Sequence, residues 1–173
     1  MPPTRTLHLL RHAKSSWADD SLPDEERPLA PRGRRATGLL SKHFESIGLD
    51  VDLVICSRAQ RTRETWDGVR AAVRCRDIVF EPAVYGASVG ELLRLVRRID
   101  PGIRSALIIG HNPGFEDLAD RLVGGGDSSA VATLREGFPT GAFATLSVEG
   151  EWSDLADGGA HLQAFVRPRD LAS

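Results

Sequence analysis

The sequence predicts an α/β fold, a three-layer α/β/α sandwich around a mostly parallel central sheet. Short apolar runs of strand length alternate with amphipathic stretches of helical period along the chain. This alternation is typical of domains in which helices connect parallel strands and cover both faces of a sheet. A length of 173 residues suits one compact domain, and no repeat or linker divides it. We therefore expect a single domain over residues 1–173.

Six apolar runs are expected to form strands. The first four are each followed by a helical stretch, so they should pair in parallel. The last two are separated by a glycine-rich turn and should run antiparallel to each other. The predicted strands are residues 7–10, 51–56, 77–81, 106–109, 142–148 and 160–166.

The first two helices are predicted from period and capping residues. The first begins at Arg32 and ends at Gly48, and the second begins at Ser57 and runs to about Ala72. Ser57 and Gln60 have the spacing of a capping box. The apolar stripe of the first helix comprises Ala36, Leu40, His43 and Ile47, with Leu39 and Phe44 alongside.

Two further helices follow the third and fourth strands. Ser88 and Glu91 form a capping box before the stripe of residues 92–99, and Asn112 and Pro113 are the expected N-cap and first residue of the next helix. The glycines at 124–126 should end that helix.

The charge balance argues against nucleic acid and membranes as partners. Lys and Arg total 22 against 24 Asp and Glu, and no apolar stretch approaches the ~20 residues of a membrane span. Lys14 and Lys42 are the only lysines, which leaves 20 arginines, an excess that genome composition alone can explain. The N-terminal residues lack a signal-peptide pattern, and two cysteines are too few for a disulfide framework. We therefore expect a cytoplasmic protein.

Three predicted strands end in chemically active side chains. Arg11 and His12 follow the first strand, Arg58 and Arg61 lie in the segment after the second, and His111 follows the fourth. The carboxyl ends of parallel strands share one edge of a sheet, where ligands bind. Two of these segments also open helices, whose free N–H groups favour anions. This convergence predicts an anion-binding site.

The same residues belong to four motifs that together resemble the histidine phosphatase superfamily, with its phosphoglycerate mutase-like fold, and more narrowly the small SixA-type phosphohistidine phosphatases. Each motif alone is only modestly specific, but their shared order and spacing are highly specific and span nearly the whole chain. The motifs are Arg11-His12-Ala13-Lys14-Ser15, the segment Glu26–Gly33, Ser57-x-Ala59-x-Arg61-x-x-x-Thr65, and Gly110-His111-Asn112-Pro113-Gly114.

The resemblance implies that His12 is a nucleophile phosphorylated on a ring nitrogen, with Arg11, Arg61 and His111 completing the phosphate pocket. The physical chemistry agrees, because a transferring phosphoryl group needs positioning and positive donors. Those donors can act without Mg²⁺, and no HxH, HExxH or Cys/His cluster suggests a metal, so we expect no cofactor. His12 must attack as neutral imidazole, so its other nitrogen should donate to a backbone carbonyl.

Two basic residues near these motifs have open roles. Lys14 stands where the superfamily usually has Glu or Asn, and either adds a cation at the pocket rim or faces solvent. Arg58 is expected on one helix face with Arg61 and Thr65, whereas Arg63 points elsewhere. Arg58 is either a rim contact or a solvated side chain of the first turn.

The proton donor is the least determined feature of the site. Glu81 lies after the third strand, where mutase-like members of the superfamily carry a catalytic glutamate, but it is also a good structural strand-end carboxylate. Asp19 and Asp20 are poorer candidates. The P–N bond of phosphohistidine is labile, so dependence on an acid should be weak.

These observations favour a metal-independent phosphatase acting on phosphohistidine in a protein. The short chain leaves little room for a lid, so a shallow site would admit a protein surface. The alternative is a phosphomonoesterase for small phosphorylated metabolites with the same His12 chemistry. A non-catalytic phosphate-binding module is the third reading. His8 and His43 are expected to be structural, and residues 26–29 to anchor a loop at the mouth of the site.

Overall fold

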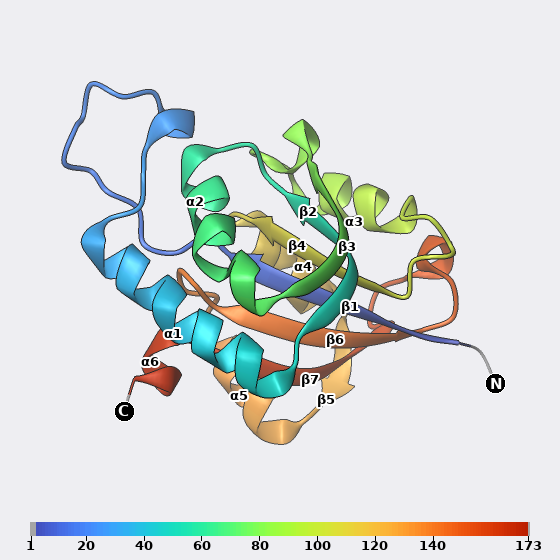
Figure 1. The fold of residues 1–173 in the computed structure, drawn as a ribbon. Coiled ribbons are helices and arrows are strands. Elements are labelled where there is room, and N and C mark those ends of the chain that lie inside the picture. The colour runs from blue at the N-terminus through green and yellow to red at the C-terminus, as the bar shows by residue number, and fades with distance from the viewer. Residues whose placement is uncertain (1–2, 173) are drawn as a thin grey trace.

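The computed structural model describes residues 3–172, so Met1, Pro2 and Ser173 of the predicted domain lie outside the described residues. Within this part of the chain the strands form one seven-stranded sheet of order β3-β2-β4-β1-β6-β7-β5 (Figure 1). The strands are β1 (Thr4–Arg11), β2 (Asp50–Cys56), β3 (Arg74–Phe80), β4 (Ser105–Gly110), β5 (Val123–Gly126), β6 (Phe143–Glu149) and β7 (Ala160–Val166).

The pairing is mostly parallel, as predicted. β1 pairs in parallel with β4, β4 with β2, and β2 with β3. β6 runs antiparallel to both β1 and β7, which confirms the orientation expected for the last two strands. The glycines at 124–126 do more than end a helix, because they form β5, which pairs with β7. Glycine has low strand propensity, so this strand depends on its partner.

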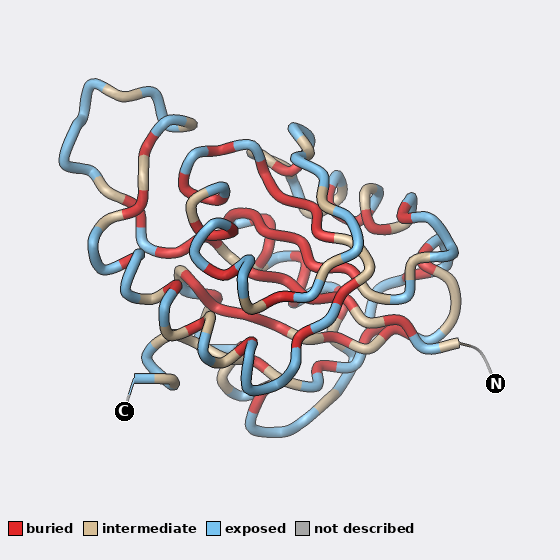
Figure 2. The backbone as a smooth tube through the Cα atoms, in the orientation of Figure 1, coloured by how far each residue is buried: buried red, intermediate tan, exposed pale blue. Residues whose placement is uncertain are grey.

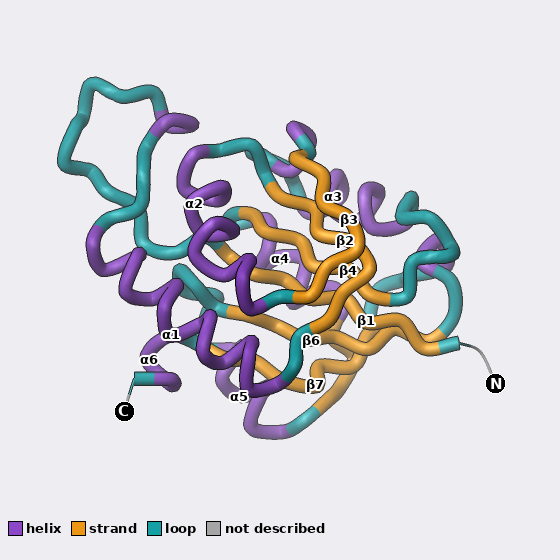
Figure 3. The backbone as a smooth tube through the Cα atoms, in the orientation of Figure 1, coloured by secondary structure: helices purple, strands orange, loops and turns teal. Residues whose placement is uncertain are grey.

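Helices cover both faces of the sheet, and Figure 3 distinguishes the two helical layers from the strands between them. One face carries α1 (Pro31–Ile47) and α2 (Gln60–Val69), beside the short α6 (Pro168–Leu171). The other carries α3 (Val89–Arg97), α4 (Gly114–Leu122) and α5 (Ser128–Arg135). α5 was not predicted from the sequence.

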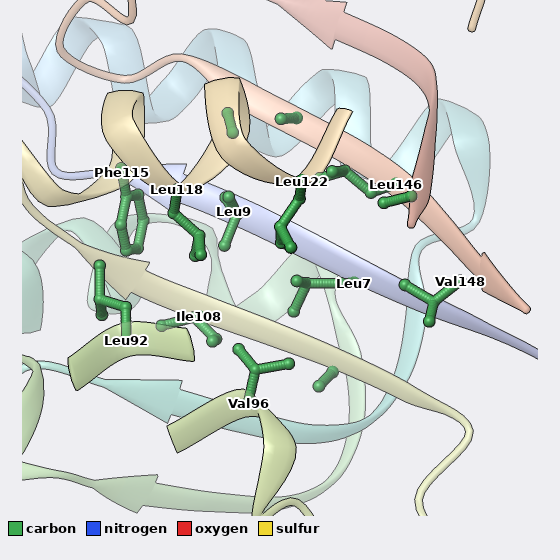
Figure 4. Close-up of a cluster of buried hydrophobic side chains, with 14 of the residues drawn as sticks. Leu7, Leu9, Leu92, Val96, Ile108, Phe115, Leu118, Leu122, Leu146 and Val148 are labelled. Atoms are coloured by element: carbon green, nitrogen blue, oxygen red, sulfur yellow. The ribbon is translucent and has the colours of Figure 1, made fainter. Parts of the chain in front are cut away.

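Each face of the sheet has its own apolar core. Alternate side chains of β1 point to opposite faces, so Leu7 and Leu9 pack with α3 and α4, whereas Leu10 packs with α1 and α2. Figure 4 shows the first of these clusters between the sheet and its helices. The central strands are buried along most of their length, whereas the long loop between β1 and α1 is largely exposed (Figure 2). No helix among residues 3–172 is long and apolar enough to cross a membrane.

The start of α2 corrects one sequence prediction. The helix begins at Gln60, with Ala59 as N-cap and no side-chain cap, whereas Ser57 was expected in that role. The Ser57 hydroxyl bonds to His111 instead. α4 likewise begins at Gly114, later than predicted, although the Asn112 side chain still accepts the Glu116 N–H at 3.2 Å. The capping box of Ser88 and Glu91 is confirmed.

The buried face of α1 is rotated relative to the predicted apolar stripe. Ile47 is 50% exposed, and the prediction that it faces the core was wrong. The helix buries Gly33, Thr37, Leu40 and Phe44. Gly33 is buried because its Cα lies against the backbone of Lys14, where an added Cβ would lie 2.1 Å from the Lys14 carbonyl oxygen. The position of the helix is therefore set by this contact as well as by its apolar residues.

Candidate active site

His12 lies immediately after β1, at the carboxyl edge of the sheet. Its backbone N–H donates to the Gly110 carbonyl at 3.0 Å, which ties it to the end of β4. Its ring Nδ1 lies 2.7 Å from the Ala13 carbonyl oxygen, and the side chain is buried. A carbonyl only accepts, so Nδ1 carries the proton and Nε2 holds a lone pair. The predicted bond to a backbone carbonyl is confirmed.

α2 fixes the segment that carries His12. The Thr65 hydroxyl donates to the Arg61 carbonyl at 2.7 Å and accepts the Ala13 N–H at 3.0 Å. Thr65 is fully buried, so this link is shielded from water. One threonine therefore couples the turn of α2 that carries Arg61 to the residue that orients the His12 ring.

The surroundings of His12 keep its ring uncharged. Burial, together with the positive charges of Arg61, Arg11 and Arg27, lowers its pKa to about 4, against the opposing effect of the Ala13 hydrogen bond. The ring is therefore neutral at neutral pH, which a nitrogen nucleophile requires.

His111 follows β4 and faces His12. The two ring centroids lie 5.4 Å apart, and the Tyr85 ring meets His111 edge-on at 5.5 Å. His111 Nε2 lies 2.7 Å from the Ser57 hydroxyl oxygen, so the residue predicted as a helix cap orients this imidazole instead. Burial first, then the neighbouring His12 and Arg61, lower the pKa of His111 to about 3. His111 is thus a neutral hydrogen-bonding group.

Arg11 and Arg61 bring two guanidinium groups to the same edge. Arg11 Nη1 donates to the Phe138 carbonyl at 2.8 Å, and Arg61 Nη1 to the Asp24 carbonyl at 2.7 Å. Both positive charges contribute to the lowered pKa of His12.

Three buried nitrogens of this group lack a hydrogen-bond partner among the described residues. They are Nε of Arg11, Nε of Arg61 and Nδ1 of His111. Buried polar groups are normally paired, since an unpaired one is costly. A tetrahedral oxyanion such as phosphate offers several acceptor oxygens at once. The donor set therefore fits a phosphoryl group beside His12 Nε2.

The sequence did not single out Asp24, which lies on the loop between β1 and α1. Its carboxylate accepts from the Tyr85 hydroxyl at 2.6 Å and from Arg61 Nη2 at 3.0 Å. These hydrogen bonds, that of Tyr85 first, lower the Asp24 pKa to about 2. Asp24 lies in a polar stretch without periodicity, and its partners are 37 and 61 residues away. The only sequence signal for Asp24 was its position in an acidic stretch near the first motif.

The loop that carries Asp24 is held at several points. Arg27 Nε lies 3.2 Å from Asp24 Oδ1, and the Arg27 guanidinium lies 3.4 Å from the centre of the exposed Trp17 ring. Leu29 forms a β-bridge with Ser15. These contacts confirm that residues 26–29 anchor a loop beside the site.

Arg58 and Glu81 lie at the edges of this arrangement. Arg58 precedes α2 and pairs with Glu25 at 3.2 Å, so the expectation that it shares a helix face with Arg61 was wrong. The reason is the later start of the helix. Glu81 Oε1 accepts the Ala83 N–H at 3.0 Å, which caps a short turn. Glu81 therefore has a structural use, and its role as an acid remains a prediction.

In the described part of the chain, the remaining predicted residues form no side-chain hydrogen bond or ring contact with His12 or His111. Lys14 is exposed and lines a cavity beside Arg11. His8 is buried in the sheet, stacked on Phe143 at 5.2 Å, and His43 packs against the ring of Phe44. Across residues 3–172, no three His, Cys, Asp or Glu side chains cluster closely enough to hold a metal ion.

The fold and the candidate site describe an α/β protein in which two histidines, His12 and His111, face each other at the carboxyl ends of β1 and β4. A phosphoglycerate mutase from Plasmodium falciparum has the same fold, at a TM-score of 0.61 and 14% identity, covering 94% of this chain and 91% of that one. A structure from Nakamurella multipartitia, assigned as a SixA phosphohistidine phosphatase, superposes with a TM-score of 0.82 at 33% identity, covering 97% and 99%.

Comparison of the amino-acid sequence agrees with the structural comparison. An uncharacterised protein of Mycobacterium tuberculosis is 36% identical over 164 residues, which cover 92% of this chain and all of the relative. The family model of the histidine phosphatase superfamily (branch 1) matches residues 7–97. The chain therefore belongs to the histidine phosphatase superfamily, and its structure is of the SixA type.

Proposed function

We propose that this protein is a phosphatase that hydrolyses phosphohistidine on a protein through a phospho-His12 intermediate. Membership of the histidine phosphatase superfamily supports phosphatase activity. The observation that carries the proposal is the His12 ring. Its Nδ1–H donates to the Ala13 carbonyl, so the neutral ring keeps a lone pair on Nε2, and Arg11, Arg61 and His111 each carry a buried nitrogen without a partner among the described residues.

The first chemical step transfers the phosphoryl group to His12. The Nε2 lone pair forms a bond to phosphorus, while the bond from phosphorus to the substrate's imidazole nitrogen breaks. That nitrogen keeps the electron pair and takes a proton from solvent. The attacking ring becomes more positive, and the hydrogen bond from Nδ1–H to the Ala13 carbonyl stabilises this charge.

In the second step water attacks phosphorus and the bond to His12 Nε2 breaks. The products are inorganic phosphate and the original neutral ring, with one proton released. In both steps charge on the phosphoryl oxygens is met by the Arg11 and Arg61 guanidinium groups and by His111. An imidazole is a better leaving group than an alkoxide, so phosphohistidine requires less from Glu81 or any other acid than a phosphate ester would.

Trapping the phosphoenzyme tests the mechanism. A protein carrying ³²P-phosphohistidine is mixed with the wild type and quenched within milliseconds in alkali and in acid. We expect label on this chain that survives alkali, is lost in acid, and is absent from His12→Ala. Circular dichroism shows whether that variant is folded. Label that persists in folded His12→Ala would exclude His12 as the nucleophile.

Substrate preference separates phosphohistidine from small phosphate esters. The kcat/KM values for a phosphohistidine protein, sugar phosphates and p-nitrophenyl phosphate are compared under one set of conditions. We expect the phosphohistidine protein to be the best substrate. A large preference for the esters would indicate a small-molecule phosphomonoesterase. Phosphate binding without turnover of any of them would indicate a non-catalytic module.

A further inference from the structure

A cavity of about 560 Å³ lies beside the proposed site, on the side of Arg11. Its walls come from the segment after β1, the first turns of α1 and α4, residues 136–140 and the beginning of α6. The proposed function does not use this cavity, although both share Arg11. The charged residues that line it are Arg11, Lys14, Arg32, Glu116, Glu136, Arg167 and Arg169.

Several of these charges are neutralised by neighbours. Arg167 pairs with Glu136 at 3.0 Å and with Asp170 at 2.8 Å. Glu116 accepts the Phe138 N–H at 2.8 Å, and its charge raises the pKa of Arg11 against the lowering effect of burial. The acidic residues of the wall are therefore already engaged.

Three cations of the wall form no ion pair with the described residues. Lys14, Arg32 and Arg169 are exposed, and their side chains form no ion pair or hydrogen bond with residues 3–172, although Arg169 is near enough to lower the pKa of Asp170. They come from three different segments, namely the turn after His12, the first turn of α1, and α6. The cavity is thus rimmed by separated positive charges.

Two hydrogen bonds link the wall of the cavity to the candidate site. The Phe138 carbonyl accepts from Arg11 Nη1 at 2.8 Å and from Asn112 Nδ2 at 2.9 Å. Arg11 thus faces the cavity and also belongs to the group around His12. A protein segment whose phosphoryl group lies at His12 would therefore place neighbouring side chains over the cavity.

From this arrangement we propose that the cavity binds acidic side chains of the phosphorylated protein, next to its phosphohistidine. The inference rests on the proposed function. Exposed, widely spaced cations are typical of the charged rim of a protein interface, whereas small-ligand sites gather a few buried polar groups. Three separate cations match carboxylates spaced along a polypeptide.

Kinetics on two peptides test the proposal. Both peptides carry one phosphohistidine, and Asp and Glu flank it in the first, whereas Asn and Gln replace them in the second. For the wild type we expect a KM about 5-fold lower on the acidic peptide, from exposed ion pairs worth about a factor of two each, with similar kcat. Added salt should reduce the difference.

Two charge-reversal variants provide the comparison. Arg32→Glu/Arg169→Glu should lose the preference for the acidic peptide while keeping the wild-type kcat/KM on p-nitrophenyl phosphate. Arg35→Glu/Arg98→Glu changes net charge equally at exposed residues outside the cavity, and should keep the preference. Circular dichroism and the p-nitrophenyl phosphate rate show that each variant is folded.

The outcomes separate the two proposals. Turnover of both peptides with equal KM, or equal loss of preference in the two variants, overturns the docking site and leaves the proposed function in place. Turnover of p-nitrophenyl phosphate without turnover of either peptide overturns both.

Discussion

Asp24 and Arg61 form an ion pair within the candidate site, with 3.0 Å between Asp24 Oδ2 and Arg61 Nη2. The Asp24 backbone carbonyl also accepts from Arg61 Nη1 at 2.7 Å. The arginine is buried, and its Nε has no partner among the described residues. Asp24 thus accepts from both Nη atoms of the guanidinium, and Nε is the nitrogen left for the proposed phosphate. In the proposed complex, Asp24 would also place a negative charge near the incoming dianion.

Asp24→Asn should strengthen phosphate binding, because it removes this negative charge while keeping the backbone contact. We expect the inhibition constant of inorganic phosphate to fall about 3- to 10-fold. Asp20→Asn, at an exposed residue of the same loop, should have no effect. Weaker phosphate binding in Asp24→Asn would show that Asp24 mainly holds Arg61 in place.

Arg61→Ala should lower kcat by at least about 10²-fold, because it removes a donor that meets charge on the phosphoryl oxygens. Arg63→Ala is the matched control on the same helix. The Arg63 side chain donates to the Arg58 carbonyl and lies over the Phe80 ring, away from His12. Steady-state kinetics on phosphohistidine protein measure both. Near-normal turnover in Arg61→Ala would mean that another arginine binds the phosphoryl group.

Gly33→Ala should destabilise the protein by about 1–3 kcal/mol, because the added methyl group would overlap the Lys14 backbone two residues from His12. Gly38→Ala, one turn later in α1, meets no atom within 4 Å. That variant should be more stable than wild type by about 0.5–1 kcal/mol. Urea unfolding measures both values. Equal stabilities would refute the close approach of α1 to the His12 segment.

Stability should fall as the pH drops from about 6.5 to 4. Burial lowers the pKa of His8 and of His12 to about 4, and that of His111 to about 3. In the unfolded chain these rings titrate near pH 6.5. Between about pH 6.5 and 4 the unfolded chain therefore binds protons that the folded chain does not bind, which favours unfolding. Each buried histidine should contribute about 1–3 kcal/mol to the loss.

The matched variants His8→Gln and His161→Gln check that pH dependence. His8 is buried in β1, away from the proposed chemistry, and His161 is exposed in β7. Urea unfolding at pH 7 and pH 4.5 should show a smaller loss of stability in His8→Gln than in wild type, and an unchanged loss in His161→Gln. The same loss in all three proteins would contradict the prediction.

The local features of the chain were largely predictable. The capping box of Ser88 and Glu91 and the end of α1 at Gly48 depend on residues a few positions apart, and both are present. The carbonyl bond of the His12 ring was also predicted correctly, because its acceptor is the next residue, Ala13. Such features follow from short-range sterics and hydrogen bonding.

Other features depend on residues far apart in the chain. Ser57 has the spacing of a helix cap, yet its hydroxyl bonds to His111, 54 residues away. α1 buries Gly33 against the Lys14 backbone, a contact that its apolar pattern does not predict. β5 pairs with β7 in spite of its glycines. In each case a tertiary contact overrides a local preference.

By itself, the sequence determined the α/β class, the strand ends that carry Arg11, His12 and His111, and the motif that contains Arg61. Hydrophobic period suffices for the fold class and the strand ends, whereas the motif that contains Arg61 was identified by its resemblance to the histidine phosphatase superfamily. Only the tertiary structure decided that Asp24 and Tyr85 join Arg61, and which cations beside Arg11 are engaged in ion pairs. The physical reason is that a long polar loop carries no periodic signal, and charge pairing depends on distances that only the folded chain sets.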